Sequence, residues 1–235
     1  MKLPGLVRLL AEDDERGEPA IAHIARMIRE AGHLPTTKRG RGASEMGVLE
    51  AANLLIAAHA TDVPAKVSET VDTFRKLRQV PMRKSEGLSI DTSTWWKRAS
   101  SCTTFGDALE ILIDQNDNDR AGICKAFNKS VGGNRSFDLI VFRAVRFAWP
   151  DLTASILINV ANAEHFREGM PHDADLSGKR FEIRFGLTEA DRIFLKDQKS
   201  AGRIHEVTVR DSVIRRLSAA CAHTSSGAPD EEAVA

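Results

Sequence analysis

The sequence predicts an α+β protein, in which a helical, winged-helix-like N-terminal part precedes an α+β part with a small antiparallel sheet. Three observations support this fold class. Apolar residues recur with helical spacing up to about residue 80. From residue 137 the pattern alternates with a period of two, through FDLIVFRAVRFAW and then LTASILINV. The Pro150-Asp151 turn between these two runs indicates a β-hairpin, and the strands of a hairpin are antiparallel.

Changes in composition along the chain suggest its domain organisation. A chain of 235 residues is long enough for one or two domains with a real core. We expect a helical, winged-helix-like DNA-binding domain over residues 1–80 and an α+β dimerisation or partner-binding domain over residues 104–222. The polar stretch that follows Val80 indicates a linker or crossing segment over 81–103. The polar, acidic end of the chain predicts a disordered tail over 223–235.

Composition excludes some classes of protein. Lys and Arg number 33, and Asp and Glu also number 33, so the chain as a whole is neutral. No run of about 18 apolar residues occurs, and the N-terminal residues do not have the pattern of a signal peptide, so we expect no membrane partner. The three cysteines are far apart in sequence and form no metal-binding pair. Reduced thiols and a cytoplasmic location are therefore expected.

A helix from Glu18 to about Ala31 is the most informative element of the N-terminal part. An apolar stripe with helical spacing is formed by Ile21, Ile24, Ala25 and Ile28. Gly32 is suited to end the helix in the left-handed conformation, and Pro35 prevents the helix from resuming. The side chains of His23, Arg26 and Arg29 lie away from the centre of the stripe. We therefore expect them to be available for contacts outside the core.

The segment after this helix is strongly basic. Lys38, Arg39 and Arg41 lie among glycines and threonines, with no apolar residue to bury. Cations on a mobile loop can replace the counterions that condense on a DNA duplex, and a short helix that is polar on its outer side fits the major groove. The pattern predicts double-stranded DNA binding through His23, Arg26, Arg29 and these three cations. A solvated basic loop and a loop that contacts a protein are the alternatives.

The run from Ile24 to Pro35, IARMIREAGHLP, resembles the end of the recognition helix in MerR-type winged-helix proteins. The wider stretch, about residues 5–45, is also similar to N-terminal segments of uncharacterised phage and prophage proteins of proteobacteria. The resemblance implies a winged helix that binds DNA. The chain lacks the aromatic pair that precedes Arg-Glu in the MerR pattern and the Gly-Tyr-Arg that closes its wing. Effector binding of the MerR kind is therefore not expected.

Catalytic patterns are sparse in the rest of the chain. The loop His172-Asp173-Ala174-Asp175 is only a fragment of a metal site, without a second ligand motif, and reads as a polar turn. The adjacent Trp95 and Trp96 could stack on bases, although anchoring of the linker onto a core is the commoner role of such residues. We expect no enzymatic activity, no cofactor and no metal.

Taken together, these features predict a sequence-specific DNA-binding protein, a transcriptional regulator of bacterial or phage type. A homodimer is expected because a single short helix supplies little discrimination between sequences. A DNA-packaging or replication subunit that recognises DNA is one alternative. The other is a protein-interaction module, such as an inhibitor or adaptor, whose basic loop meets an acidic partner.

Overall fold

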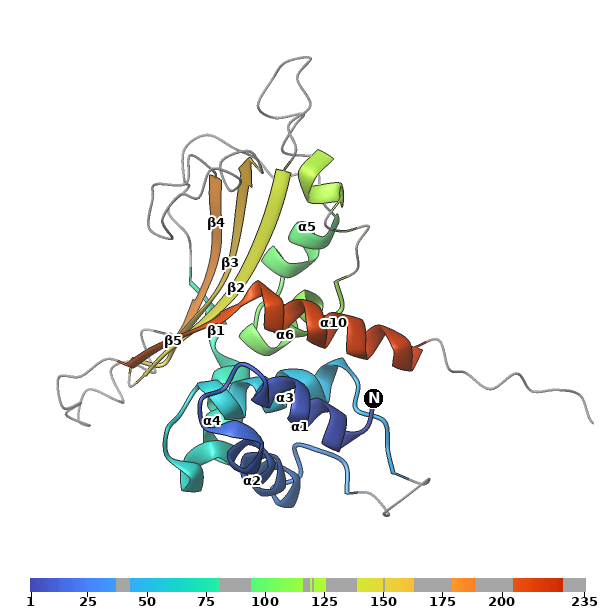
Figure 1. The fold of residues 1–235 in the computed structure, drawn as a ribbon. Coiled ribbons are helices and arrows are strands. Elements are labelled where there is room, and N and C mark those ends of the chain that lie inside the picture. The colour runs from blue at the N-terminus through green and yellow to red at the C-terminus, as the bar shows by residue number, and fades with distance from the viewer. Residues whose placement is uncertain are drawn as a thin grey trace, which may run out of the picture.

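Helices at the N-terminus and a five-stranded antiparallel sheet later in the chain make up the fold, as Figure 1 shows, and the α+β prediction is confirmed. The structure is a computed structural model. It describes residues 1–36, 43–80, 94–115, 119, 121–125, 139–149, 151–162, 179–188 and 205–225.

In the described residues of the N-terminal part there are four α-helices and one short 3-10 helix. In chain order these are α1 (Leu3–Ala11), α2 (Gly17–Glu30), α3 (Val48–His59), η2 (Pro64–Lys66) and α4 (Val67–Lys76). α3 is the central helix, because every residue from Ala51 to Ala58 is buried. It packs against both α2 and α4. An apolar helix that is covered on all sides in this way holds its neighbours in place.

The end of α2 is fixed by a complete Schellman motif. Gly32 has φ = +89°, the left-handed conformation that the sequence predicted for it. Its N–H donates to the carbonyl of Arg29 at 3.1 Å, and the N–H of His33 donates to the carbonyl of Ile28 at 2.9 Å. Both bonds satisfy carbonyls at the helix end that would otherwise lack a partner. The backbone therefore leaves α2 in one defined direction.

A buried polar network connects this helix end to the rest of the fold. Asn53 of α3 is 4 % exposed, and its side-chain Nδ2 donates to the carbonyl of His33 at 2.9 Å. Its Oδ1 accepts from Nη1 of Arg75 in α4 at 2.9 Å. Arg75 in turn donates through Nη2 to Glu110 at 2.5 Å. One amide thus joins the segment that follows α2 to α3, α4 and the helix that carries Glu110.

The sheet has the strand order β1-β4-β3-β2-β5, and every neighbouring pair is antiparallel. Its strands are β1 (Arg78–Gln79), β2 (Leu139–Trp149), β3 (Thr153–Asn162), β4 (Lys179–Gly186) and β5 (His205–Arg210). The predicted hairpin is β2–β3, in register from Leu139↔Asn162 to Ala148↔Thr153. Val141, Val145 and Phe147 are buried on one face of β2, which agrees with the alternation in the sequence.

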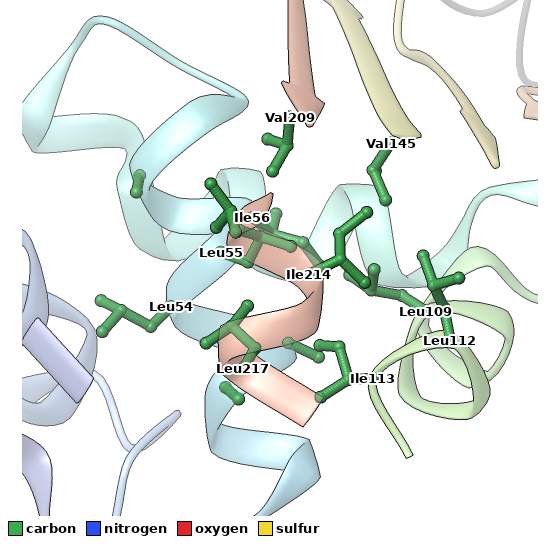
Figure 2. Close-up of a cluster of buried hydrophobic side chains, with 14 of the residues drawn as sticks. Leu54, Leu55, Ile56, Leu109, Leu112, Ile113, Val145, Val209, Ile214 and Leu217 are labelled. Carbon is green, nitrogen blue, oxygen red and sulfur yellow. The ribbon is translucent and has the colours of Figure 1, made fainter. Parts of the chain in front are cut away.

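Three of the helices that follow pack with the sheet and with the N-terminal part. They are α5 (Thr94–Ser100), α6 (Phe105–Ile113) and α10 (Asp211–Ser225). Figure 2 shows how Ile214 and Leu217 of α10 lie among apolar side chains of α3 and α6, with Val145 of β2 and Val209 of β5 on the side of the sheet. Apolar residues of the N-terminal helices and of the sheet therefore belong to one continuous core.

This core extends across the boundary that the sequence suggested at residue 80. α6 packs on α3 and α4, α10 packs on α1 and α3, and β1 pairs with β4. Part of the expected linker, 81–103, is helical, since α5 covers Thr94–Ser100 and packs on α6, while residues 81–93 lie outside the described residues. The helix α10 continues to Ser225, so the first three residues of the expected disordered tail are helical.

We predict that Asn53→Ala lowers the free energy of unfolding by about 1–3 kcal/mol, because the part-buried carbonyl of His33 and Nη1 of Arg75 both lose their partner, although Arg75 keeps its contact with Glu110. Lys76→Ala, an exposed change at the end of α4, is the matched control and should alter stability by less than about 0.5 kcal/mol. Urea denaturation of both variants checks this. Equal stability of the two variants would contradict the role given to Asn53.

Stability should also fall in acid because of His59, the last residue of α3. Burial lowers the pKa of His59 to about 4, against an opposing contribution from Asp14. A histidine whose folded pKa lies below its unfolded value of about 6.5 binds a proton more readily when unfolded. Its contribution to stability is complete above pH 6.5 and is lost as the pH falls towards 4.

The expected loss between pH 7 and pH 4.5 from this group is roughly 2 kcal/mol. His59→Gln should remove this part of the acid response, whereas the same change at exposed His23 should retain it. Denaturant titrations of both variants at the two pH values test the assignment. An unchanged acid response in His59→Gln would show that other groups cause it.

Candidate nucleic-acid interface

The outward side of α2 carries the polar residues that the sequence predicted there. The stripe of Ile21, Ile24, Ala25 and Ile28 is buried. His23 and Arg26 are exposed, whereas Arg29 is half-buried at the flank of the helix. Each of these three side chains therefore lies off the buried stripe, and two of them face solvent directly.

Arg26 is paired with an acid on its own helix. Its Nε lies 2.7 Å from Oε1 of Glu30, one turn further on, and the two side chains are 66 % and 60 % exposed. The hydrogen bond between them raises the pKa of Arg26 and lowers that of Glu30. The sequence analysis counted the cations and did not predict this ion pair. The i,i+4 spacing of Arg26 and Glu30 is a recognised signal for it. The centre of the outer face is accordingly less positive than its composition suggests.

Arg29 is the cation of α2 that has no ion pair within the described part of the chain. It lies in the last turn of the helix, where a positive charge is favourable to the helix dipole. The carbonyl of Arg29 belongs to the Schellman motif, so its backbone is fixed while its guanidinium remains available. Positive charge on α2 is thus concentrated towards the end that leads into the basic segment.

Residues 37–42, which include Lys38, Arg39 and Arg41, lie outside the described residues. The structure does place the two ends of this segment. Leu34 before it and Met46 after it are both buried. Met46 N–H donates to the carbonyl of Met1 at 2.6 Å. The basic segment therefore begins and ends at points held on the helical part.

The flanks of the segment differ from those of a winged-helix wing. A wing is a hairpin, whose two flanking stretches pair with each other. In the described residues, the stretches on either side of 37–42 form no such ladder. Glu45 instead forms an antiparallel bridge with Lys2, and its carboxylate lies 2.8 Å from the N-terminal amine. The N-terminal residues thus pair with the stretch after the basic segment, in the position that the other strand would have in a wing.

The tryptophans predicted to anchor or to stack take the anchoring role. Trp95 is 1 % exposed, and its Nε1 donates to the carbonyl of Ile111 at 3.0 Å. Trp96 packs edge-on against Phe181 of β4, with ring centroids 6.0 Å apart. Because the Trp95 ring is enclosed, it has no face on which a base could stack. These two residues hold α5 to α6 and the sheet.

His172, Asp173 and Asp175 lie outside the described residues. Within the residues that the structure does describe, no three or more His, Cys, Asp or Glu side chains are grouped so that they could hold a metal ion. Among the same residues, no helix combines the length and the apolar character needed to cross a bilayer.

The buried side chain of Arg143 was not predicted. Arg143 of β2 is 2 % exposed and lies on the helix-covered face of the sheet. Its Nε is 2.7 Å from Oδ1 of Asp211, which also accepts from the backbone N–H of Arg143, and its Nη1 donates to Oε1 of Gln115. Asp211 is 68 residues away in the chain, so no local pattern in the sequence could have indicated the pair.

No protein-family model, curated protein or solved structure matches this chain.

Proposed function

We propose that the protein binds double-stranded DNA in a sequence-specific manner and acts as a transcriptional regulator of bacterial or phage type. In this proposal α2 lies in the major groove, where His23, Arg26 and Arg29 meet base edges or backbone. Lys38, Arg39 and Arg41 contact the phosphates beside it. The observation that supports the proposal most is the end of α2, where a fixed helix leads directly into a basic segment.

The dimensions of α2 suit this role. Its 14 residues span roughly 21 Å, and a helix of ordinary diameter enters the major groove of B-DNA, which is about 12 Å wide. The helix is attached to the core through one apolar stripe only, so its outer side is free to approach the duplex. The Schellman motif and the Asn53 contact keep it rigid, which reduces the ordering cost of binding.

Arg26 must exchange partners if it is to read a base. Glu30 holds its Nε in the free protein, and a guanine offers two acceptors in the major groove that a guanidinium can bind together. Because the Arg26–Glu30 pair is exposed, its contribution to stability is small and the exchange costs little. The carboxylate of Glu30 would then lie close to the phosphates and would weaken binding to every duplex.

A dimer is part of the proposal. Regulators of this kind gain discrimination by placing two reading helices in two half-sites about one helical turn apart. A monomer with one reading helix has few base contacts, and each mismatched base pair costs only about 1–3 kcal/mol. The alternatives retained are a DNA-packaging or replication subunit and a protein-interaction module with an acidic partner.

We predict that replacing Lys38, Arg39 and Arg41 together by Ala weakens binding to all duplexes about equally. Each lost phosphate contact should also reduce the salt dependence by roughly one unit of log–log slope, because fewer counterions are released on binding. Titration of a random duplex at several salt concentrations measures both effects.

The matched control removes three other exposed cations, Lys97, Arg98 and Lys125, all of which lie outside α2 and the basic segment. This control should bind DNA like the parent protein. If the Lys38/Arg39/Arg41 variant binds random duplex as tightly as the parent does, the basic segment does not contact phosphate. If both triple variants lose affinity equally, only the net charge matters.

A second prediction separates sequence reading from stability. Arg26→Ala should lower affinity for a selected duplex by about tenfold or more and leave random-duplex binding nearly intact, since a bidentate Arg–guanine contact contributes about 1–3 kcal/mol of discrimination. Ile24→Ala should instead lower the free energy of unfolding by about 2–5 kcal/mol, because Ile24 belongs to the buried stripe. Competition binding at fixed salt and urea denaturation make these measurements.

Two further variants control this experiment. Arg184→Ala on β4 is the matched change, because Arg184 is also 66 % exposed and is also paired with an acid, Glu182 at 3.0 Å. It should leave both affinities unchanged. Glu30→Gln should strengthen binding to every duplex by removing a negative charge. An Arg26→Ala protein that keeps the parent's ratio of selected to random affinity would favour the protein-interaction module.

A further inference from the structure

The strand β5 forms one edge of the sheet. On one side it pairs with β2, in a continuous register from Ala144↔Arg210 to Trp149↔His205. Within the described residues, no strand pairs with its other side. The strand at the opposite edge of the sheet, β1, has only two residues, whereas β5 has six. The longer edge strand therefore directs a row of backbone N–H and C=O groups away from the sheet.

Several features that commonly protect an edge strand from pairing are missing from β5. Its sequence, HEVTVR, contains no proline, glycine or lysine, and its register with β2 has no bulge. Valine and threonine, which make up half of it, favour strands. An edge of this kind accepts a further strand by antiparallel pairing. In a symmetric homodimer, the strand that pairs with it is β5 of the second copy.

The two valines of β5 lie on the face of the sheet that the helices cover. Val207 and Val209 stand opposite Phe147 and Val145 of β2, and both of these β2 residues are buried. Val209 is 4 % exposed, whereas Val207 is only half-buried. The apolar layer under the sheet is therefore incomplete at this edge, where another apolar side chain would cover Val207.

The other face of β5 carries one charge of each sign. Glu206, Thr208 and Arg210 alternate with the valines and are all exposed. Glu206 forms an ion pair with Arg146 of β2 at 2.8 Å. Arg210 has no ion pair within the described part of the chain. The acid and the base are four residues apart, on the same face, with Thr208 midway between them.

This arrangement is complementary to a second copy of itself. When Thr208 lies opposite Thr208 of the second copy, Glu206 lies opposite Arg210, and the two-fold symmetry forms this pair twice. Side chains in such positions have Cβ atoms about 4.5–5.5 Å apart, and opposite charges and threonine pairs are favourable there. On the helix-covered face, Val207 then lies opposite Val209. A shift of one residue would join opposite faces of the two sheets, and a shift of two would remove both ion pairs.

We propose that β5 is an interface between two copies of this chain, which pair antiparallel around Thr208 and so continue the sheet across the dimer. Two Glu206–Arg210 ion pairs fix the register. This inference rests on the proposed function for the expectation of a dimer, and it assigns that dimer a surface. A two-fold axis at β5 places one α2 on each side of it, as two symmetric half-sites require.

The test measures self-association of the full-length protein without DNA. Sedimentation equilibrium should show a monomer–dimer equilibrium, with a dimer fraction that rises up to a concentration of about 200 µM, because one strand pair buries little surface and forms a weak interface. Larger assemblies should not form, since two paired β5 strands make a closed two-fold contact that leaves no β5 edge for a third copy.

Reversal of one charge should separate the copies. Arg210→Glu should weaken the dimer at least about tenfold, because it turns two attractive pairs into two repulsive ones. The double variant Glu206→Arg/Arg210→Glu should restore the affinity to within about threefold, since both ion pairs form again in reverse. Arg146 stands opposite Thr208, diagonal to both positions, so it has an acid beside it in either case. Arg215→Glu, the same change at an exposed arginine of α10, should associate like the parent.

A disulfide tests the register without changing a charge. Thr208→Cys places two cysteines opposite each other, with Cα atoms about 4.5–5.5 Å apart, which is within the range that a disulfide spans. Mild oxidation should link the two copies through the introduced cysteine, and peptide mapping by mass spectrometry identifies the bond. Ala65→Cys, at an exposed position of η2, should link no more than the parent does with its own three free cysteines.

The proposal is overturned if the protein stays monomeric at about 200 µM, or if Arg210→Glu and Arg215→Glu associate equally. It is also overturned if the double charge reversal does not restore the dimer, or if Thr208→Cys links no faster than Ala65→Cys. A dimer with these properties that binds no duplex would contradict only the DNA-binding proposal. A protein that reads DNA as a monomer would contradict only the β5 interface, so the two proposals fail separately.

Discussion

The contact on which the arrangement of the fold most depends is the buried side chain of Asn53. Its amide holds the His33 carbonyl just beyond α2 and accepts from Arg75, which reaches Glu110 on α6. A buried amide of this kind stabilises a fold only when both its ends are satisfied, and it then specifies one arrangement of its neighbours. The direction in which the chain leaves α2, and therefore the place from which the basic segment starts, follows from this contact together with the Gly32 turn.

The N-terminal helices and the sheet share one cluster of buried apolar side chains. The helix α10 is the last described element, yet Ile214 and Leu217 lie among side chains of α3 and α6 (Figure 2). At the surface, Arg216 of α10 binds Glu12 and Asp13 between α1 and α2. A surface that is presented by α2 is thereby supported by residues about 200 positions later in the chain. Substitutions in the C-terminal part can therefore affect how the N-terminal helices are held, even at residues that would not contact DNA.

Local patterns in the sequence predicted much of this fold, whereas contacts between distant residues were missed. The stripe of Ile21, Ile24 and Ile28, the left-handed Gly32 and the β2–β3 hairpin each depend on neighbours in sequence and were all predicted. The Arg143–Asp211 pair joins residues 68 apart, and strand β1 is only two residues long, so neither has a periodic signal. The segment of α5 was assigned to the linker because it follows a polar run and forms a helix of only about two turns. Of the candidate site, the exposure of His23 and Arg26 follows from helical spacing, but the pairing of Arg26 with Glu30 was overlooked.

Amide hydrogen exchange of the full-length protein with and without duplex DNA tests the central claim most directly, because it reports where the duplex lies along the whole chain. The account predicts slower exchange in peptides that cover α2 and the following basic segment, residues 18–46, and no change in β4, whose exposed arginine is also paired with an acid. Protection confined to the sheet, or no protection at a DNA concentration that saturates binding, would contradict the assignment of α2 as the reading helix.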